Sequence, residues 1–466
     1  MIPDCVVEPV SQNCPLRGSA QRKEGYDNRV KILILSQYWS PENGVPQRRW
    51  NWLTGLLKDG NHDITVIAPR PHYERDIGIR TWFKKRYYRA STDPISGPSG
   101  ERIIRSGFIP SNRSLLGKIF NQSAVALGAI WVIVKKPGFL SGYKPDLIIG
   151  TVPALPTAAV TFIASHSFNA PYLIDLRDAW PHLLTDRSDW NRGVKGDSHR
   201  QRPYLRALGS VASSVVTKVF YALLRNASVI TVTSSYLGRE LRTRSELHSR
   251  GRGSPAVFTI RNVFGTQTEV SGERRVPAGQ RPLRVLYAGT IGRAQNLENA
   301  VLAASICKTR GTEVELCFVG SGVAKNRVES IAKQNSVPAY FVSRQKAEDL
   351  AEFYMWADTA LVHLTDWKAL EMVVPSKTYE LMELGIHITA VAAGETADLV
   401  SSLAAGDVVS PEDPESLAAL WIRMQKLKHK PFVSPEAADW VKQQRTSVAP
   451  ATLKDAVNYA TERGRE

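Results

Sequence analysis

The sequence predicts an α/β protein made of two doubly wound domains in tandem. Two observations indicate this class. Short runs of branched apolar residues, bounded by turn residues, recur at the spacing of a strand plus a helix. A segment without periodicity then interrupts the series, and a second series follows. Ligands of such sheets bind beyond the carboxyl ends of the strands, so we expect the two domains to face each other across a cleft.

The first series contains five runs that we predict to be buried parallel strands. They are KILILS from Lys31, ITVIAP from Ile64, DLIIGT from Asp146, PYLIDL from Pro171 and VITVTS from Val229. Between the first two runs, Trp50, Leu53 and Leu57 fall on one face of a predicted helix that ends at Gly60. This arrangement is one βαβ unit.

Residues 265–282 lack periodicity and are rich in Gly, Pro and charge, so we predict a domain linker there. The second series of predicted strands is LRVLYAG from Leu283, VELCFVG from Val314, AYFVS from Ala339, TALVHL from Thr359 and HITAVAA from His387. Residues 29–264 and 283–445 are therefore expected to form two Rossmann-like domains. Residues 1–28 are polar and are expected to be a disordered extension.

Charge is distributed unevenly along the 466 residues. Residues 1–270 hold 37 Lys and Arg against 20 Asp and Glu, whereas the remaining residues are almost neutral, so the whole net charge of +16 lies in the first part. This asymmetry predicts an anionic partner for the first domain. The four cysteines form no metal-ligand spacing or disulfide framework, which favours a reducing, cytoplasmic compartment.

Two glycine turns of the second domain could hold a nucleotide. In AGTIGRAQNLENAV, Gly289 and Gly292 precede a helix that we expect to start near Arg293, where free amides and a guanidinium suit a diphosphate. In VGSG, Gly320 and Gly322 could lie against a base. The competing interpretation is that any turn between a strand and a helix favours glycine.

The segment PSKTYELMELG carries a more specific pattern. Pro375 precedes Ser376, the expected N-cap, and a short helix over residues 377–384 would carry Lys377 and Glu380 toward the cleft. Glu380 could accept hydrogen bonds from both hydroxyls of a ribose while the amides of the helix start hold a phosphate. The alternative is that an acidic residue near a helix start is favourable without any ligand.

Two segments of the first domain end predicted strands with polar residues. Gly44 opens a helix start that could approach a diphosphate or sugar from the opposite wall of the cleft. In LIDLRDAWP, a catalytic role for Asp178 and a salt bridge between Arg177 and Asp178 are equally supported.

Aromatic residues are interleaved with basic ones in two stretches, Arg70–Arg89 and Arg187–Tyr204. Such a pattern is typical of contact with an anionic lipid surface or with single-stranded nucleic acid, and a basic surface exposed only to solvent is the third interpretation of these stretches. Their occurrence beside the apolar run over residues 124–134, which is too short to span a bilayer, favours peripheral contact with the inner face of the cell membrane. No nucleic-acid partner is expected.

Taken together, these segments resemble the retaining glycosyltransferases of the GT-B fold, family four (group 1), and more narrowly the bacterial transferases of O-antigen and capsule sugars, including the fucosamine transferase type. The resemblance covers about Lys31 to Ala418. It rests on KILILSQYWSPENGVPQRRW, LIDLRDAWP, ITVTSSYLGRELR, LYAGTIGRAQNLE, VGSG, PSKTYELMELG, AVAAGETADLV and AGDVVSPEDPESLA. It implies a nucleotide-sugar donor, with UDP expected, bound by the second domain and a lipid-linked or other cell-envelope saccharide acceptor bound by the first. It also implies that residues 446–466 form a helix that packs back on the first domain.

The resemblance further implies roles for single residues. These are Glu380 on the ribose hydroxyls, Arg293 and Gly44 on the diphosphate, Gly320 and Gly322 at the base, and Ser376 and Lys377 on phosphate or sugar. Met372 stands where the family has the first glutamate of its E-x7-E pattern. Retention through front-face attack is expected, without metal or cofactor. The rival hypotheses are a nucleotide-sugar 2-epimerase, a transferase onto a soluble acceptor, and a non-catalytic scaffold or nucleic-acid binder.

Overall fold

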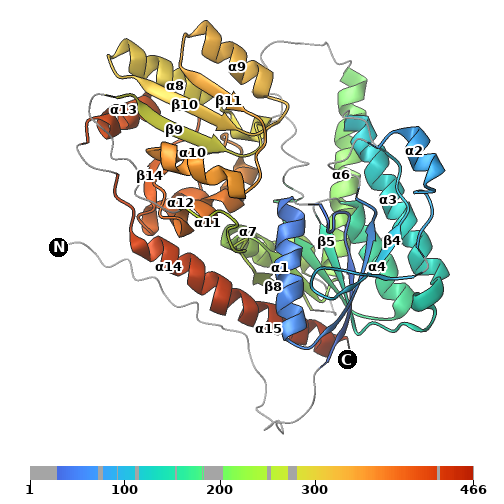
Figure 1. Ribbon diagram of the computed structural model, residues 1–466. Coiled ribbons are helices and arrows are strands. Elements are labelled where there is room, and N and C mark those ends of the chain that lie inside the picture. Colours follow the sequence, from blue (N-terminus) through green and yellow to red (C-terminus); the bar gives the residue numbers. More distant parts are fainter. Residues whose placement is uncertain are drawn as a thin grey trace, which may run out of the picture.

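The computed structural model describes residues 29–42, 44–71, 77–91, 93–110, 115–152, 155–180, 182, 203–248, 253–270, 281–427 and 431–464. The chain folds into two lobes, each built around one sheet (Figure 1). The first lobe contains the strands up to residue 259, and the second contains those from residue 283 to 409. The predicted α/β class with two doubly wound sheets is confirmed.

Among the described residues, the sheet of the first lobe has eight strands in the order β3-β4-β2-β1-β5-β6-β7-β8, and only the β3–β4 pair is antiparallel. The strands are β1 (Lys31–Leu35), β2 (Asp63–Pro69), β3 (Ile95–Ser96), β4 (Arg102–Ser106), β5 (Leu147–Val152), β6 (Tyr172–Leu176), β7 (Val229–Val232) and β8 (Ala256–Thr259). The central strands are buried along their whole length, as the apolar runs predict.

The sheet of the second lobe has six parallel strands in the order β11-β10-β9-β12-β13-β14. They are β9 (Leu283–Ala288), β10 (Val314–Val319), β11 (Ala339–Val342), β12 (Thr359–His363), β13 (Ile388–Val391) and β14 (Gly406–Val409). All ten predicted runs are strands. The sequence missed β3, β4, β8 and β14, because these are short or broken by charged residues and therefore lack a continuous apolar run.

Helices cover both faces of each sheet, which is the doubly wound arrangement. In the first lobe they are α1 (Val45–Asp59), α2 (Ile79–Lys84), α3 (Leu115–Lys135), α4 (Pro156–Phe168), α6 (Pro203–Arg225) and α7 (Ser235–Thr243). In the second lobe they are α8 (Glu298–Thr309), α9 (Lys325–Gln334), α10 (Ala351–Trp356), α11 (Ser376–Glu383), α12 (Glu395–Ser402), α13 (Pro414–Gln425) and α14 (Pro435–Gln443).

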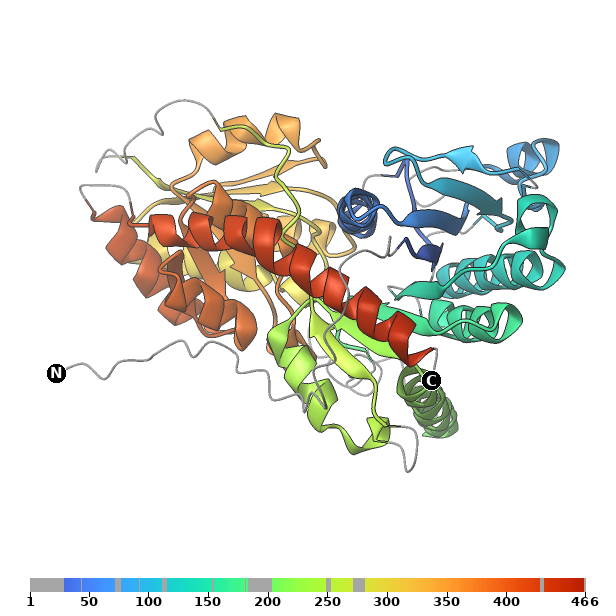
Figure 2. The same ribbon diagram turned by 90° about the horizontal axis from the view of Figure 1, so that it is seen from below.

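The 3-10 helices are η1 (Gly138–Gly142), η3 (Ser245–Leu247), η4 (Arg293–Gln295), η5 (Glu348–Leu350) and η6 (Lys368–Met372), and η7 (Gln444–Val448) is a π-helical turn. Turn η7 joins α14 to α15 (Ala449–Arg463) without a break. Figure 2 shows α14 and α15 as one long helical segment that runs from the second lobe along the underside of the first.

The amphipathic pattern of α1 sets how this helix sits on the first sheet. Trp50, Leu53 and Leu57 are buried together with residues of β1 and β2, and Gly60 follows the helix as its C-cap. Helix α15 packs on the same side, where Leu453 and Val457 join that cluster. The C-terminal helix therefore contributes to the core of the first lobe.

Helix α3 contains the apolar run over residues 124–134. Val132 and Ile133 are fully buried against the first sheet, whereas Leu127, Trp131 and Val134 are exposed. Among the described residues, no helix has both the length and the apolar character that a membrane span requires. The predicted N-terminal extension, residues 271–280 of the predicted linker and nearly all of the basic stretch from Arg187 lie outside the described residues.

Candidate functional site

Helix α11 carries Lys377 and Glu380. The helix begins at Ser376, whereas the sequence analysis expected Ser376 to be the N-cap. The expected cap is therefore wrong by one position. Pro375 occupies the N-cap with φ −57° and ψ 133°, because its ring fixes an extended entry into the helix, and no side chain caps the helix start.

The carboxylate of Glu380 is buried, with 9% of the residue exposed, and it is held from within the second lobe. The Tyr354 hydroxyl of α10 donates to Glu380 Oε1 at 2.9 Å, and Lys377 Nζ donates to Oε2 at 3.0 Å. Lys377 Nζ also lies 3.0 Å from the Tyr354 oxygen. These three side chains form a closed ring of hydrogen bonds.

Burial perturbs the ionisation of this ring. Burial, reinforced by the negative charge of Glu380, raises the pKa of Tyr354 above its ordinary value. Burial lowers the pKa of Lys377, and the neighbouring Glu380 carboxylate opposes that change. Tyr354 is therefore a permanent hydrogen-bond donor to Glu380 at physiological pH.

Arg48 on α1 approaches the same ring from the first lobe. Its guanidinium donates to the carbonyl oxygen of Gly265 at 3.1 Å and lies 4.7 Å from the centre of the Phe264 ring. Burial lowers the pKa of Arg48, while Glu380 and Tyr354 favour its charged form. The sequence analysis missed this cation because Arg48 and Arg49 are adjacent in the sequence. Only the packing of α1 determines that their side chains point in different directions.

The two glycine turns of the second lobe lie against each other. Ile291 N donates to Ser321 O and Gly289 N to Val319 O, both at 3.0 Å. A Cβ atom on Gly320 would lie 1.8 Å from the oxygen of Gly289, and one on Gly322 would lie 2.1 Å from the oxygen of Ile291. Close backbone approach therefore requires both glycines, whether or not a nucleotide binds there.

The helix after Gly289 and Gly292 starts later than the sequence analysis expected. Arg293 opens the short turn η4, and Asn296 then takes a left-handed conformation with φ 36°, so α8 begins only at Glu298. The expected helix start near Arg293 is wrong for this reason. Gly292 N is already bonded to Gln295 Oε1 at 3.2 Å. Arg293 itself is exposed, and no hydrogen bond or ion pair between described residues joins it to Glu380.

Gly44 lies at the N-cap of α1, where the sequence analysis placed a helix start. The helix has no side-chain cap, and Gly44 is extended with φ −90° and ψ 170°. A Cβ atom here would lie 2.6 Å from Gln47 Oε1. Because that atom ends a flexible side chain, the close approach alone does not demand glycine.

The motif LIDLRDAWP divides into separate roles. Asp175 is fully buried and pairs with Arg49 at 2.8 Å. The sequence analysis considered a salt bridge between Arg177 and Asp178; the two charges affect each other's pKa, but no ion pair joins them among the described residues. Arg177 Nε and Nη1 are buried and find no hydrogen-bond partner within the part of the chain that the structure describes. Burial raises the pKa of Asp178, and Arg177 opposes this change. Asp178 follows the carboxyl end of β6.

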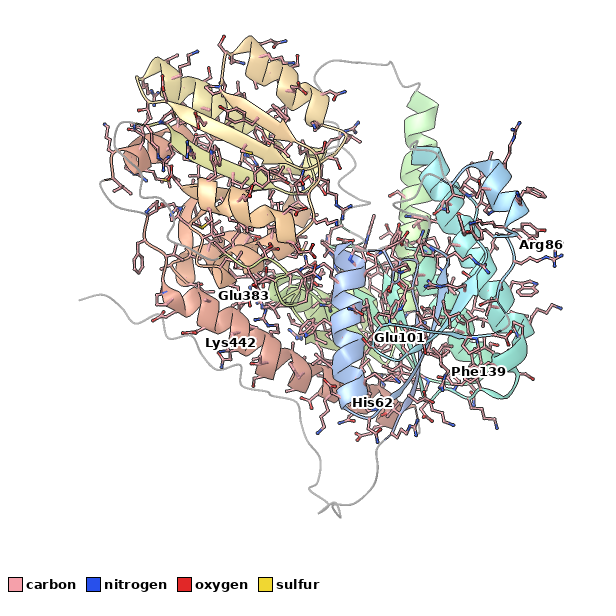
Figure 3. The ribbon with its side chains drawn as sticks, in the orientation of Figure 1. His62, Arg86, Glu101, Phe139, Glu383 and Lys442 are labelled. Atoms are coloured by element: carbon pink, nitrogen blue, oxygen red, sulfur yellow. The ribbon has the colours of Figure 1, made fainter. Side chains whose placement is uncertain are left out.

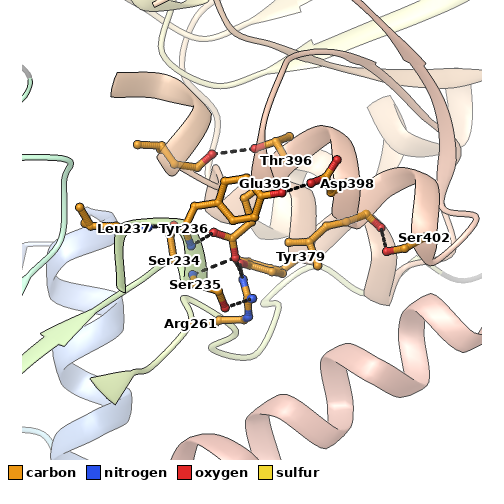
Figure 4. A network of polar contacts seen from close by, with 12 residues as sticks. Ser234, Ser235, Tyr236, Leu237, Arg261, Tyr379, Glu395, Thr396, Asp398 and Ser402 are labelled. Carbon is orange, nitrogen blue, oxygen red and sulfur yellow. Dashed lines mark hydrogen bonds and ion pairs between the residues drawn. The ribbon is translucent and has the colours of Figure 1, made fainter. Parts of the chain in front are cut away.

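A second polar network joins the two lobes and was not anticipated. Glu395, the first residue of α12, accepts hydrogen bonds from Ser234 Oγ at 2.5 Å and from the amides of Ser235 and Tyr236 at 3.0 and 2.8 Å (Figure 4). Arg261 pairs with the same carboxylate at 2.5 Å. A side chain of the second lobe thus caps α7 of the first.

Contacts around η6 also join the lobes. Ala369 is buried in the apolar cluster of the first lobe, and Met372 and Val373 pack against it. Met372 therefore makes an apolar contact between the lobes. Within the described part of the chain, no three His, Cys, Asp or Glu side chains gather in a way that could hold a metal ion.

Residues 273–446 match the family described as glycosyl transferases group 1. The chain is also similar to an Escherichia coli K12 protein named "Putative colanic acid biosynthesis glycosyl transferase WcaI", with 24% identity over 412 residues that cover 84% of this chain and 91% of the relative.

Two solved structures share the arrangement of both lobes. Anabaena Alr3699/HepE, in complex with UDP-glucose, matches with a TM-score of 0.58 and 14% identity over 92% of this chain and 100% of that one. Sucrose-phosphate synthase from Thermosynechococcus elongatus matches with a TM-score of 0.55 and 17% identity over 94% and 98%. These likenesses establish the predicted GT-B fold.

Proposed function

Because this chain is a group 1 glycosyltransferase with the GT-B fold, we propose that it transfers a sugar from a UDP-sugar to a lipid-linked or other saccharide acceptor during the synthesis of a cell-envelope polysaccharide. The complex of HepE with UDP-glucose supports the choice of donor. The name of the Escherichia coli relative, which refers to colanic acid biosynthesis, supports the class of pathway.

The observation that carries the proposal is the buried carboxylate of Glu380 beside two cations from different lobes, Lys377 and Arg48. A carboxylate accepts hydrogen bonds from the two hydroxyls of a ribose, and cations stabilise a diphosphate. Lys377, Arg48 and the exposed Arg293 then supply positive charge to the leaving UDP. In this proposal the turns around Gly44, Gly289, Gly292, Gly320 and Gly322 and the helix start at Pro375 and Ser376 line the donor.

The proposed reaction proceeds with retention. The acceptor hydroxyl attacks the anomeric carbon from the side that UDP leaves, and a departing phosphate oxygen takes the hydroxyl proton. Asp178, which follows the carboxyl end of β6, is proposed to contribute at the acceptor side by orienting the acceptor hydroxyl, while the phosphate oxygen takes the proton.

Thermal unfolding with UDP, GDP and ADP tests the donor first. A ligand present at 100 times its Kd stabilises a protein by about 2.7 kcal/mol, so UDP should raise the Tm clearly and the other two nucleotides should not. The Glu380→Gln variant should lose this shift, whereas the control variant Glu352→Gln, exposed on α10, should keep it.

Product analysis separates the proposed reaction from its rivals. NMR of the product should show a new glycosidic bond with the anomeric configuration of the donor. An inverted product would contradict retention, an isomerised UDP-sugar without transfer would indicate an epimerase, and the absence of nucleotide binding would favour a scaffold.

We also propose that the outer side of the first lobe rests on an anionic membrane. Helices α2 and α3 expose apolar side chains: Ile79, Phe83, Phe120, Leu127, Trp131 and Val134. Basic side chains lie on the same elements, and Figure 3 shows Arg86 projecting outward from this side of the lobe. Apolar insertion and attraction to anionic lipid would act together, with about 1 kcal/mol from each nearby cation.

Vesicle flotation tests this membrane contact. Vesicles with phosphatidylserine should carry the protein at low salt and release it at high salt. Replacing Leu127 and Trp131 by Ser should weaken flotation, whereas replacing Val323 and Tyr340, exposed on the second lobe, should not. Flotation that depends neither on the salt concentration nor on the charge of the lipid would contradict the proposal.

A further inference from the structure

We propose that Tyr354 is a positioning residue that fixes the Glu380 carboxylate for the two ribose hydroxyls of a nucleotide donor. This inference rests on the proposed function, because it requires that Glu380 binds a ribose. Tyr354 lies on α10 and is absent from the matching motifs around Glu380, 26 residues further along the chain.

The direction of each hydrogen bond in the ring follows from its chemistry. The ammonium group of Lys377 can only donate, so the Tyr354 oxygen, 3.0 Å away, accepts from it. The carboxylate of Glu380 can only accept, so the single hydroxyl proton of Tyr354 goes to Oε1 at 2.9 Å. Lys377 closes the ring by donating to Oε2 at 3.0 Å. Each carboxylate oxygen thus has its own donor.

Packing keeps the Tyr354 hydroxyl in this place. Tyr354 is fully buried, and its ring belongs to the apolar cluster between the second sheet and α11, where Tyr379 and Leu381 also lie. Burial and the adjacent carboxylate keep the hydroxyl protonated. The donor to Oε1 is therefore fixed in position and in protonation state.

Another hydroxyl near Oε1 cannot replace it. Thr268 Oγ1 lies 3.4 Å from Oε1, but it donates its one proton to the carbonyl oxygen of Ala347 at 2.6 Å. Without the Tyr354 hydroxyl, Oε1 loses its strong donor while Lys377 still holds Oε2. The carboxylate could then rotate about the Cγ–Cδ bond of Glu380. Binding of a ribose would have to offset the conformational entropy that is lost when the carboxylate becomes ordered.

The consequence is specific to the ribose hydroxyls. A fixed carboxylate presents its remaining lone pairs in one plane, which suits two neighbouring hydroxyls. A nucleotide without those hydroxyls gains nothing from this arrangement. Removal of the Tyr354 hydroxyl should therefore weaken a complete nucleotide and leave a dideoxy nucleotide unaffected.

Calorimetric titration with UDP and with 2′,3′-dideoxy-UDP tests the inference. Wild-type protein should bind UDP about tenfold or more tighter than the dideoxy nucleotide, the scale of hydrogen bonds to a charged group. In Tyr354→Phe this ratio should fall to about two, with the affinity for the dideoxy nucleotide unchanged. That unchanged affinity also shows that the variant is folded.

The variant Thr268→Val is the matched control, because it removes a hydroxyl near the same oxygen whose proton is used elsewhere. It should keep the wild-type ratio. Three results would overturn the inference alone: a ratio that persists in Tyr354→Phe, an equal loss of affinity for both nucleotides, or a collapse of the ratio in Thr268→Val. Failure of the wild-type protein to bind UDP would instead refute the proposed function, and the inference with it.

Discussion

His363 shows how one buried side chain links stability to pH. It ends β12 with 2% exposure, and its Nε2 lies 3.1 Å from Nδ2 of Asn299. Burial lowers the pKa of His363 from 6.5 to about 3. The unfolded chain therefore binds this proton below pH 6.5, whereas the folded protein stays unprotonated to about pH 3.

The free energy of unfolding should thus fall as the pH decreases from 6.5 toward 3, by about 1.4 kcal/mol per pH unit from this residue. In His363→Gln the amide oxygen can still accept from Asn299, but no proton is taken up. Urea unfolding at several pH values should show that the variant gains stability relative to the wild type on acidification. A difference that does not change with pH would contradict a neutral His363.

At the scale of elements, the turns after β9 and β10 depend on backbone contact. Gly322→Ala would place a Cβ 2.1 Å from the oxygen of Ile291, so the turns must separate. We expect a loss of about 1–3 kcal/mol in the free energy of unfolding and weaker UDP binding. The control Gly55→Ala lies in α1 with open space around its Cβ, and it should stabilise the protein by about 0.5–1 kcal/mol. Equal effects of the two substitutions would refute the packing argument.

At the scale of the whole molecule, Glu395 holds the lobes together. In Glu395→Gln the partly buried Arg261 loses its ion pair, and the amides of α7 lose a charged cap. We expect a loss of about 3–5 kcal/mol and a larger radius of gyration in small-angle scattering, because the lobes can separate. The exposed pair of Arg310 and Glu415 provides the control.

Glu415→Gln should change the free energy of unfolding by no more than about 0.5 kcal/mol and should leave the scattering curve unchanged. If Glu395→Gln behaved in the same way, the network around Glu395 would have no role in the arrangement of the lobes. Calorimetry adds a second readout, since loosened lobes should unfold in two steps rather than one.

The sequence by itself determined the features that depend on neighbouring residues. Periodicity placed the ten apolar strands and the helix of Trp50, Leu53 and Leu57, and the motifs indicated the second lobe as the place of Lys377 and Glu380. These patterns are local, because a strand repeats every two residues and a helix every 3.6.

Only the tertiary structure decided which groups meet across the chain. Tyr354 reaches Glu380 from another helix, Glu395 reaches α7 over a separation of about 160 residues, and Arg48 rather than Arg49 faces the candidate site. The structure also shows that Asp175 pairs with Arg49 and that α8 starts only after Asn296. Such contacts depend on how whole elements pack, and no spacing within a single element encodes that packing.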